Sequence, residues 1–194
     1  GENGAGKSTL MSILYGFYEA DRGTIRIKGE DVRIRSPKEA IQQGIGMVHQ
    51  HFMLVEPLSV IDNVLLGAEG GAMLGKGEAA MRAALATLSR DYGLEIDPDA
   101  IVGDLPVGLQ QRVEILKALV RGADILILDE PTAVLTPDEA EQLFVLLRRL
   151  ASQGKTILLI THKLNEIMHV TDHVSVMRRG EMVAHFETAK TSPE

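Results

Sequence analysis

The first nine residues of the chain have the types and spacing of a loop that binds phosphate. They read Gly1-Glu2-Asn3-Gly4-Ala5-Gly6-Lys7-Ser8-Thr9 and fill the pattern G-x-x-x-x-G-K-[ST]. Glycines let the backbone curl so that successive N–H groups point at an anion, and the start of the following helix adds positive charge. We expect Lys7 to reach the β- and γ-phosphates, Ser8 to hold Mg²⁺ and Thr9 to lie near the α-phosphate. The loop therefore predicts binding of a nucleoside triphosphate with Mg²⁺; the alternative is a plain glycine turn before a helix.

A pair of acids follows an apolar run in the second half of the chain. Residues 125–128 are apolar, and Asp129 and Glu130 come directly after them. Ligands of open α/β sheets bind where the strands end, so both carboxylates are expected at a binding edge. We expect Asp129 to join the Mg²⁺ shell and Glu130 to polarise the attacking water. Alone, the pair could be a solvated strand end; after a phosphate-binding loop it predicts hydrolysis.

Hydrophobic periodicity and capping signals predict the elements that position these residues. Capping boxes predict helices from Ser36 to near Gly44 and from Thr136 to near Gly154. Further helices are predicted after the loop, at 10–16 with Gly16 near the end, at 78–92 and at 109–120. Strands are predicted at 24–28, 32–34, 45–49, 125–128, 156–160, 174–177 and 182–186. Apolar strands that alternate with helices indicate a parallel sheet covered on both faces, with antiparallel pairs near each end of the sequence. The predicted fold class is therefore α/β.

Composition limits the classes of function. The chain has 194 residues, no cysteine and a formal net charge of −7. This length suits one domain, and the acidic balance without a dense Lys/Arg run disfavours nucleic-acid binding. The absence of cysteine excludes disulfides and thiolate metal sites and fits a reducing cytoplasm. No apolar stretch is long enough to span a bilayer, so a membrane role would need a partner.

Five motifs in order resemble the nucleotide-binding subunits of ABC transporters: GENGAGKST, VHQHF, LPVGLQQR, ILILDEPTAVLT and ITHK. The resemblance implies a P-loop NTPase fold with a RecA-like core, a small antiparallel β part and a helical subdomain at about 62–121 inserted in one domain, 1–194. It also implies that Gln50 meets Mg²⁺ and the water and begins a loop, about His51 to Val60, that touches a membrane subunit. His162 would contact the γ-phosphate.

Two stretches depart from the family pattern. The signature L-S-G-G-Q reads Leu105-Pro106-Val107-Gly108-Leu109 here, followed by Gln110. In the family, this segment grips the γ-phosphate bound to the opposite subunit. Proline offers neither hydroxyl nor N–H, and Val107 adds bulk, so a lost hydrogen bond to phosphate would weaken this grip by about 1.5–3 kcal/mol. The family's S-A-L-D stretch is replaced here by A-V-L-T at 133–136. Thr136 can still cap a helix, but it lacks the negative charge of the family's Asp. We therefore expect an asymmetric pair of ATP sites.

Both departures resemble the ATP-binding proteins of bacterial simple-sugar and nucleoside importers. That branch implies ATP and Mg²⁺ as ligands, a second nucleotide-binding domain in the same full-length chain, membrane permease subunits, and a solute-binding protein acting indirectly. It also implies a peripheral position on the cytoplasmic face of the inner membrane. We expect the chain to be the first domain of the pair, cut at both ends, with the strand and base-stacking residue that precede the loop lying upstream. Two alternatives stay open: a soluble ABC ATPase of DNA repair or translation, and a nucleotide-dependent switch with little turnover.

Overall fold

The computed structural model describes residues 4–50, 52–67 and 77–191, and its centre is a parallel sheet. Strand β4 (Ile125–Asp129) lies between β3 (Ile45–Val48) and β5 (Thr156–Ile160). Ile45 pairs with Ile125, and Asp129 pairs with Ile160. The carboxyl ends of all three strands therefore lie at one edge, as predicted for an α/β fold.

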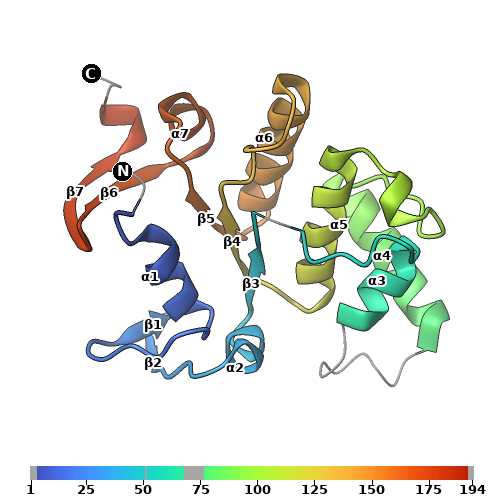
Figure 1. Cartoon of the computed structure of the whole chain (residues 1–194), viewed down its shortest axis with the longest axis horizontal. Helices are drawn as coiled ribbons and strands as arrows, with labels where there is room; N and C mark the ends of the chain where they lie inside the picture. Colours follow the sequence, from blue (N-terminus) through green and yellow to red (C-terminus); the bar gives the residue numbers. More distant parts are fainter. Residues whose placement is uncertain (1–3, 51, 68–76, 192–194) are drawn as a thin grey trace.

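Helices cover both faces of this sheet because its apolar side chains alternate between them (Figure 1). Met47 and Ile127 point to one side, where they pack with α1 (Lys7–Leu14) and α2 (Pro37–Gln42). Val48, Leu126 and Leu128 point to the other side, where they pack with α5 (Val107–Val120) and α6 (Pro137–Ser152). The sheet thus separates α1 from α5.

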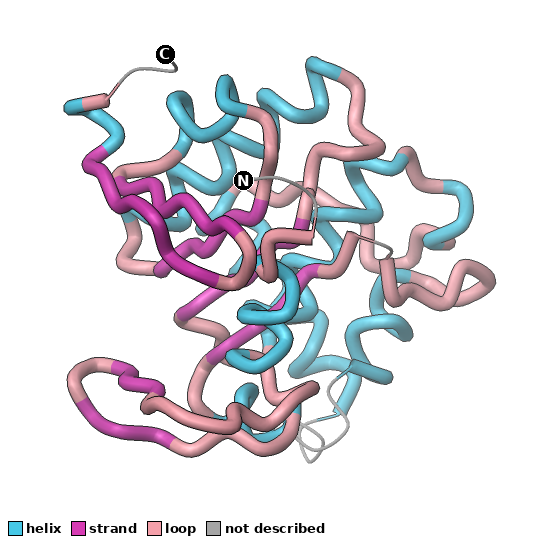
Figure 2. The backbone as a smooth tube through the Cα atoms, turned by 60° about the vertical axis from the view of Figure 1, so that its left-hand side comes forward, coloured by secondary structure: helices cyan, strands magenta, loops and turns pink. Residues whose placement is uncertain are grey.

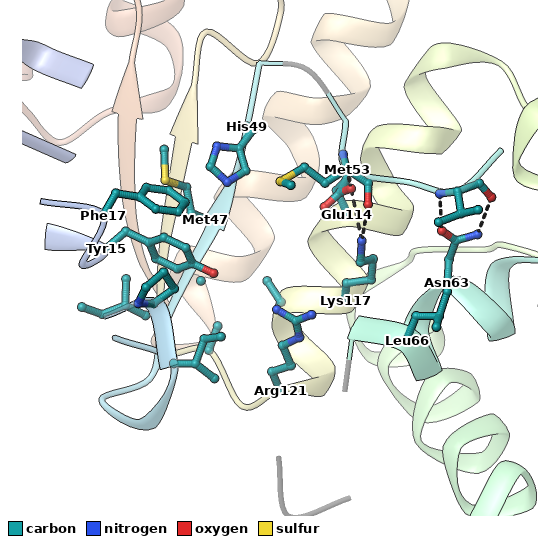
Figure 3. Close-up of a pocket in the computed structure, with 17 residues that line it drawn as sticks. Tyr15, Phe17, Met47, His49, Met53, Asn63, Leu66, Glu114, Lys117 and Arg121 are labelled. Atoms are coloured by element: carbon teal, nitrogen blue, oxygen red, sulfur yellow. Dashed lines mark hydrogen bonds and ion pairs between the residues drawn. The ribbon is translucent and has the colours of Figure 1, made fainter. Parts of the chain in front are cut away.

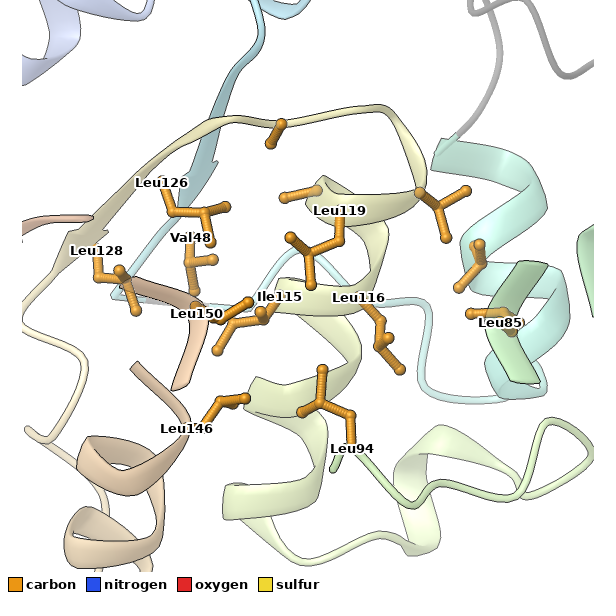
Figure 4. Packing of buried hydrophobic residues seen from close by; sticks show 14 of the residues in the cluster. Val48, Leu85, Leu94, Ile115, Leu116, Leu119, Leu126, Leu128, Leu146 and Leu150 are labelled. Atoms are coloured by element: carbon orange, nitrogen blue, oxygen red, sulfur yellow. The ribbon is translucent and has the colours of Figure 1, made fainter. Parts of the chain in front are cut away.

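A helical part packs on the second face of the sheet, with α5 next to the sheet. Besides α5 it comprises α3 (Val60–Gly67), α4 (Gly77–Tyr92) and a 3₁₀ turn η1 (Val102–Asp104). Figure 4 shows Ile115, Leu116 and Leu119 of α5 between the sheet and Leu85 of α4. One continuous apolar core therefore joins the helical part to the sheet.

Two antiparallel hairpins complete the fold. The first pairs β1 (Ile25–Ile27) with β2 (Glu30–Val32), and Figure 2 shows it set apart from the other strands. After β5 come α7 (Leu164–Val170) and then the second hairpin, β6 (His173–Arg178) with β7 (Glu181–Glu187), which ends in η2 (Thr188–Lys190). None of the helices in the described part of the chain combines the length and apolar character that crossing a bilayer requires.

Most predicted elements are present, and three details were predicted wrongly. The second strand lies at 30–32 rather than 32–34, and α5 begins at Val107 rather than 109. The predicted capping box at Ser36 is only half formed. The Ser36 hydroxyl accepts from the Glu39 N–H at 3.3 Å, but the Glu39 carboxylate accepts from Arg35 N–H at 2.7 Å instead. Neither α3 nor α7 was predicted as a separate helix.

Candidate active site

The described part of the phosphate-binding loop, from Gly4 on, and the helix after it have the backbone that the glycine pattern predicts. Gly4 and Gly6 have φ angles of 78° and 93°, left-handed values that glycine adopts at little cost. Gly6 is the N-cap of α1, so the helix begins at Lys7. The first amides of a helix have no intrahelical acceptors and attract anions. The positive end of α1 thus lies where phosphate is predicted to bind. Gly1, Glu2 and Asn3 lie outside the described residues.

The turn of the second hairpin supports this loop. Gly180 donates its N–H to the carbonyl of Ala5 at 2.9 Å. Ala5 is buried, and a Cβ added to Gly6 would lie 3.4 Å from the Cα of Gly180. The hairpin and the loop are therefore in direct backbone contact.

Asp129 ends β4 beside the start of α1. The hydroxyl of Ser8 forms a hydrogen bond with its carboxylate, while burial raises the pKa of the Asp129 carboxyl. Its Oδ1 is buried and has no hydrogen-bond partner among the described residues. Hard divalent cations prefer oxygen donors of this kind. Ser8 and Asp129 together therefore fit the predicted Mg²⁺.

Glu130 and His162 leave adjacent strands, and their side chains meet. The Glu130 N–H donates to the carbonyl of Ile160 at 2.9 Å, which extends the β4–β5 ladder by one step. Glu130 has a φ of 45°, a conformation that costs a non-glycine residue about 1–3 kcal/mol and recurs at functional sites. Its Oε1 lies 3.1 Å from Nδ1 of His162. A carboxylate able to accept a proton and an imidazole able to donate a hydrogen bond thus share one edge of the sheet.

Gln50 leaves the sheet at this same edge. Val48, the last residue of β3, pairs with Leu128, and Gln50 is exposed two residues further on. Gln50 follows β3, and Asp129 ends the neighbouring strand β4. Because neighbouring parallel strands end side by side, Gln50 and Asp129 lie at the same edge of the sheet. His51, with which the predicted contact loop begins, lies outside the described residues.

The signature residues form the start of α5, across the sheet from α1 (Figure 1). Pro106 is the N-cap and makes no capping bond with its side chain. The N–H of Gly108 donates to Oε1 of Glu139 at 3.1 Å, and the side-chain amide of Gln110 donates to the carbonyl of Leu105 at 3.0 Å. The predicted segment, Leu105-Pro106-Val107-Gly108-Leu109 with Gln110, thus cannot close over the loop of its own chain. One of its amides is also already bound to a carboxylate.

Three polar residues behind the Glu130–His162 pair were not predicted from the sequence. Thr132, Thr161 and Glu166 are buried, and both threonine hydroxyls donate to the Glu166 carboxylate. The only signal in the sequence was an acid within the short, mainly apolar stretch 164–170.

The site as a whole has the parts of a nucleotide-hydrolysing centre. Ser8, Asp129, Glu130 and His162 converge from the start of α1 and the ends of β4 and β5. The start of α1 can hold phosphate, Asp129 can hold a cation, and Glu130 can take a proton from water.

Known proteins resemble this chain over almost its whole length. The family model described as "ABC transporter" matches residues 1–133. The nucleoside import ATP-binding protein NupA of Lactococcus lactis subsp. cremoris is 51% identical over 195 residues, covering 100% of this chain and 38% of that protein. The glucose import ATP-binding protein TsgD13 of Haloferax volcanii is 48% identical over 220 residues, covering 99% of this chain and 40% of that protein. The chain thus spans less than half the length of these curated relatives.

A solved structure shares the fold. The protein cbiO1 from Clostridium perfringens, part of the ABC transporter complex cbiONQ, superposes with a TM-score of 0.83 at 29% identity. The match covers 98% of this chain and 76% of that one. The layers, the helical part and the hairpins described above therefore occur together in an experimentally known protein.

Proposed function

The chain belongs to the ABC transporter family, and from this premise we propose that it is the ATP-binding and ATP-hydrolysing part of an importer for a nucleoside or a simple sugar. The observation that carries the proposal is the contact of Glu130 with His162 beside Asp129 and Ser8. The solute class rests on the names of the relatives, one a nucleoside importer and the other a glucose importer.

Each residue of the proposed site has a role that its position supports. The loop at 1–9 and Lys7 hold the phosphates of ATP, and Ser8, Asp129 and Gln50 would hold Mg²⁺, which supplies neutralisation of phosphate charge when bound. Glu130 takes a proton from the attacking water, and His162 donates a hydrogen bond to the charge that develops on the γ-phosphate. Because Glu130 and His162 touch, each orients the other.

The signature segment is proposed to close the ATP site of a second nucleotide-binding domain. It lies across the sheet from its own phosphate-binding loop (Figure 1), so two domains must meet to complete each site. ATP drives that closure only through its higher affinity for the closed pair. Pro106 and the occupied Gly108 amide favour slow turnover in the site that this segment closes.

A groove beside β3 is the proposed docking place for a membrane permease. Its volume is about 370 Å³, and its lining includes the exposed apolar side chains of Phe17, Met53 and Leu66. Glu114 accepts from Met53 N–H at 2.8 Å, and Lys117 donates to the Met53 carbonyl at 2.9 Å (Figure 3). The segment that follows Gln50 is therefore fixed to α5. An apolar groove with a charged floor suits a short amphipathic helix, and its contact with α5 would link the permease to the signature.

The remaining partners follow from this arrangement. A second nucleotide-binding domain is proposed in the same full-length protein, and a solute-binding protein would act only through the permease. The chain would work as one domain, with 62–121 as its helical subdomain, on the cytoplasmic face of the bacterial inner membrane. No role for nucleic acid is proposed.

Replacement of Glu130 by Gln tests the proposed hydrolysis. In the transporter complex, loss of a general base should lower ATP turnover by about 10²- to 10⁴-fold, while ATP binding persists. Glu141→Gln is the matched control, since Glu141 is exposed on α6 and pairs only with Arg148 at 3.4 Å among the described residues. Unchanged turnover in Glu130→Gln would refute hydrolysis at this site. It would place the turnover in the other ATP site of the pair and favour the second candidate for this site, a nucleotide-dependent switch.

A further inference from the structure

We infer that Glu166 is a positioning residue that fixes the distance between the two loops that carry Glu130 and His162. The inference rests on the proposed hydrolysis at these two residues. It concerns a buried carboxylate on α7 whose hydrogen bonds go to other residues and which the proposed mechanism does not use.

The Glu166 carboxylate joins the two loops through one oxygen each. Its Oε1 accepts from the hydroxyl of Thr132, in the loop after β4. Its Oε2 accepts from the hydroxyl of Thr161, in the loop after β5, at 2.8 Å. Glu166 is 7% exposed, Thr161 7% and Thr132 3%. Water therefore does not compete for these hydrogen bonds, and a low local dielectric strengthens them.

Lys163 closes the same network from the solvent side. Its Nζ lies 3.2 Å from Oε1 of Glu166 and donates to the carbonyl and the hydroxyl of Thr132 at 3.2 and 3.1 Å. Its backbone N–H donates to the Thr161 hydroxyl at 3.1 Å. Each polar group in the network thus has a hydrogen-bond partner in the opposite loop or in α7. These hydrogen bonds favour one arrangement of the loops after β4 and β5.

The joined residues are the nearest neighbours of the reacting side chains. Thr161 directly precedes His162, and Thr132 follows Glu130 by two positions. The two loops are therefore linked twice, by the Glu130–His162 contact of 3.1 Å and by the hydrogen bonds of Glu166. Glu130 also needs this support, because its φ of 45° is unfavourable for a residue with a side chain. Without the carboxylate, the loop after β4 is free to relax and to carry Glu130 away from His162.

This arrangement predicts a separation of catalysis from binding. Among the described residues, the phosphate-binding loop is supported by the β6–β7 turn, and the hydrogen bonds of Glu166 go to Thr132 and Thr161 instead. Loss of the carboxylate should therefore lower kcat while leaving the KM for ATP nearly unchanged. Displacement of catalytic groups by about 1 Å commonly costs about 100-fold, and loss of an orienting partner about 10- to 100-fold.

Steady-state ATPase assays on the transporter complex test the inference. Glu166→Ala should lower kcat roughly 10- to 100-fold, with little change in KM. Glu166→Gln should recover most of the rate, since an amide can pair with two hydroxyls that rotate to suit it. Thr132→Val removes the hydrogen bond to Glu166 at nearly constant side-chain shape and should lower kcat. Thr132→Ser keeps the hydroxyl and should leave kcat unchanged. Glu141→Ala, an exposed acid on α6, is the control with unchanged kcat.

Melting temperatures and Glu130→Gln separate the possible outcomes. If Glu166→Ala does not fold, the Thr132→Val and Thr132→Ser pair decides. Wild-type kcat in Glu166→Ala and Thr132→Val, while Glu130→Gln abolishes turnover, overturns the inference and leaves the proposed function intact. A rise in KM that accounts for the whole loss of kcat/KM also overturns it. If Glu130→Gln itself retains turnover, the proposed function fails and the inference fails with it.

Discussion

The contact between β3 and α5 depends on the absence of a side chain at Gly46. A Cβ at this position would lie 2.7 Å from the Cβ of Ala118, 3.1 Å from that of Ala123 and 3.3 Å from Cδ2 of Leu126. Gly46 does not have a positive φ, so alanine meets a steric obstacle and no backbone strain. The nearest obstacle is a methyl group of α5, the helix that begins with the signature.

Gly46→Ala should lower the free energy of unfolding by about 1–2 kcal/mol. Overpacking of a core costs about 1–3 kcal/mol. The loss of backbone freedom in the unfolded chain, about 0.4–1 kcal/mol for Gly to Ala, acts in the opposite direction. Urea denaturation followed by circular dichroism measures the difference, and an unchanged m-value shows that the two-state treatment holds.

Removal of the obstructing methyl should rescue this variant. In an Ala118→Gly background the 2.7 Å contact is gone, and Gly46→Ala should cost less than about 0.5 kcal/mol, a coupling of about 1 kcal/mol between the two positions. Ala83→Gly, at an exposed site of α4, controls for the helix-propensity cost of glycine and should rescue nothing. An equal cost of Gly46→Ala in all three backgrounds would refute the steric argument.

Three further predictions follow from the site and the surface. Pro106→Ser with Val107→Gly should raise ATP turnover in the assembled transporter, and an unchanged rate would count against the weakened signature. Asp129→Asn should weaken Mg²⁺-dependent ATP binding about 10- to 100-fold by calorimetry, while binding without Mg²⁺ stays the same; an equal loss in both conditions contradicts the assignment. Two lysine ammonium groups lower the pKa of the Asp124 carboxyl, so its ion pairs stabilise the fold above the unfolded-state pKa and are lost as pH falls through the folded value. Asp124→Asn should therefore cost at most about 1 kcal/mol at pH 7 and less below about pH 4; a cost that grows on acidification would contradict this sign.

Elements with strong local signals were predictable from the sequence. β5 occupies the predicted residues, 156–160, because a run of apolar and β-branched residues is most stable as a buried strand. α6 begins where predicted because Thr136 and Glu139 cap one another through side chain and backbone. The described part of the phosphate-binding loop was predictable for a similar reason, since Gly4 and Gly6 adopt the positive φ angles that its backbone requires.

The register of the first hairpin was not predictable from its strand pattern. Lys28 and Gly29 have φ angles of 53° and 86°, which make a two-residue turn of the kind that matches strand twist. This turn pairs Ile27 with Glu30, so the second strand begins before the β-branched residues that predicted it. Turn geometry outweighed side-chain preference here.

The Glu166 network could not be predicted because its ties are distant in sequence. Thr132 and Glu166 are separated by 34 residues, and α7 has only seven residues and no side-chain cap at Lys163. Short helices of this kind are held by tertiary packing and not by local signals. Only the pairing of β4 with β5 brings the two threonines to one carboxylate.

The bond between Gly180 and Ala5 has a consequence for the order in which this protein becomes structured. Ala5 leaves the ribosome before its partner turn, which follows only after β3, β4, β5 and α7 have been made. Contacts between residues so far apart close a large loop and are formed late in folding. During synthesis, the Ala5 carbonyl must therefore wait for the β6–β7 turn before this hydrogen bond can form. We expect ATP to act as a late folding ligand, binding only once residue 180 has emerged.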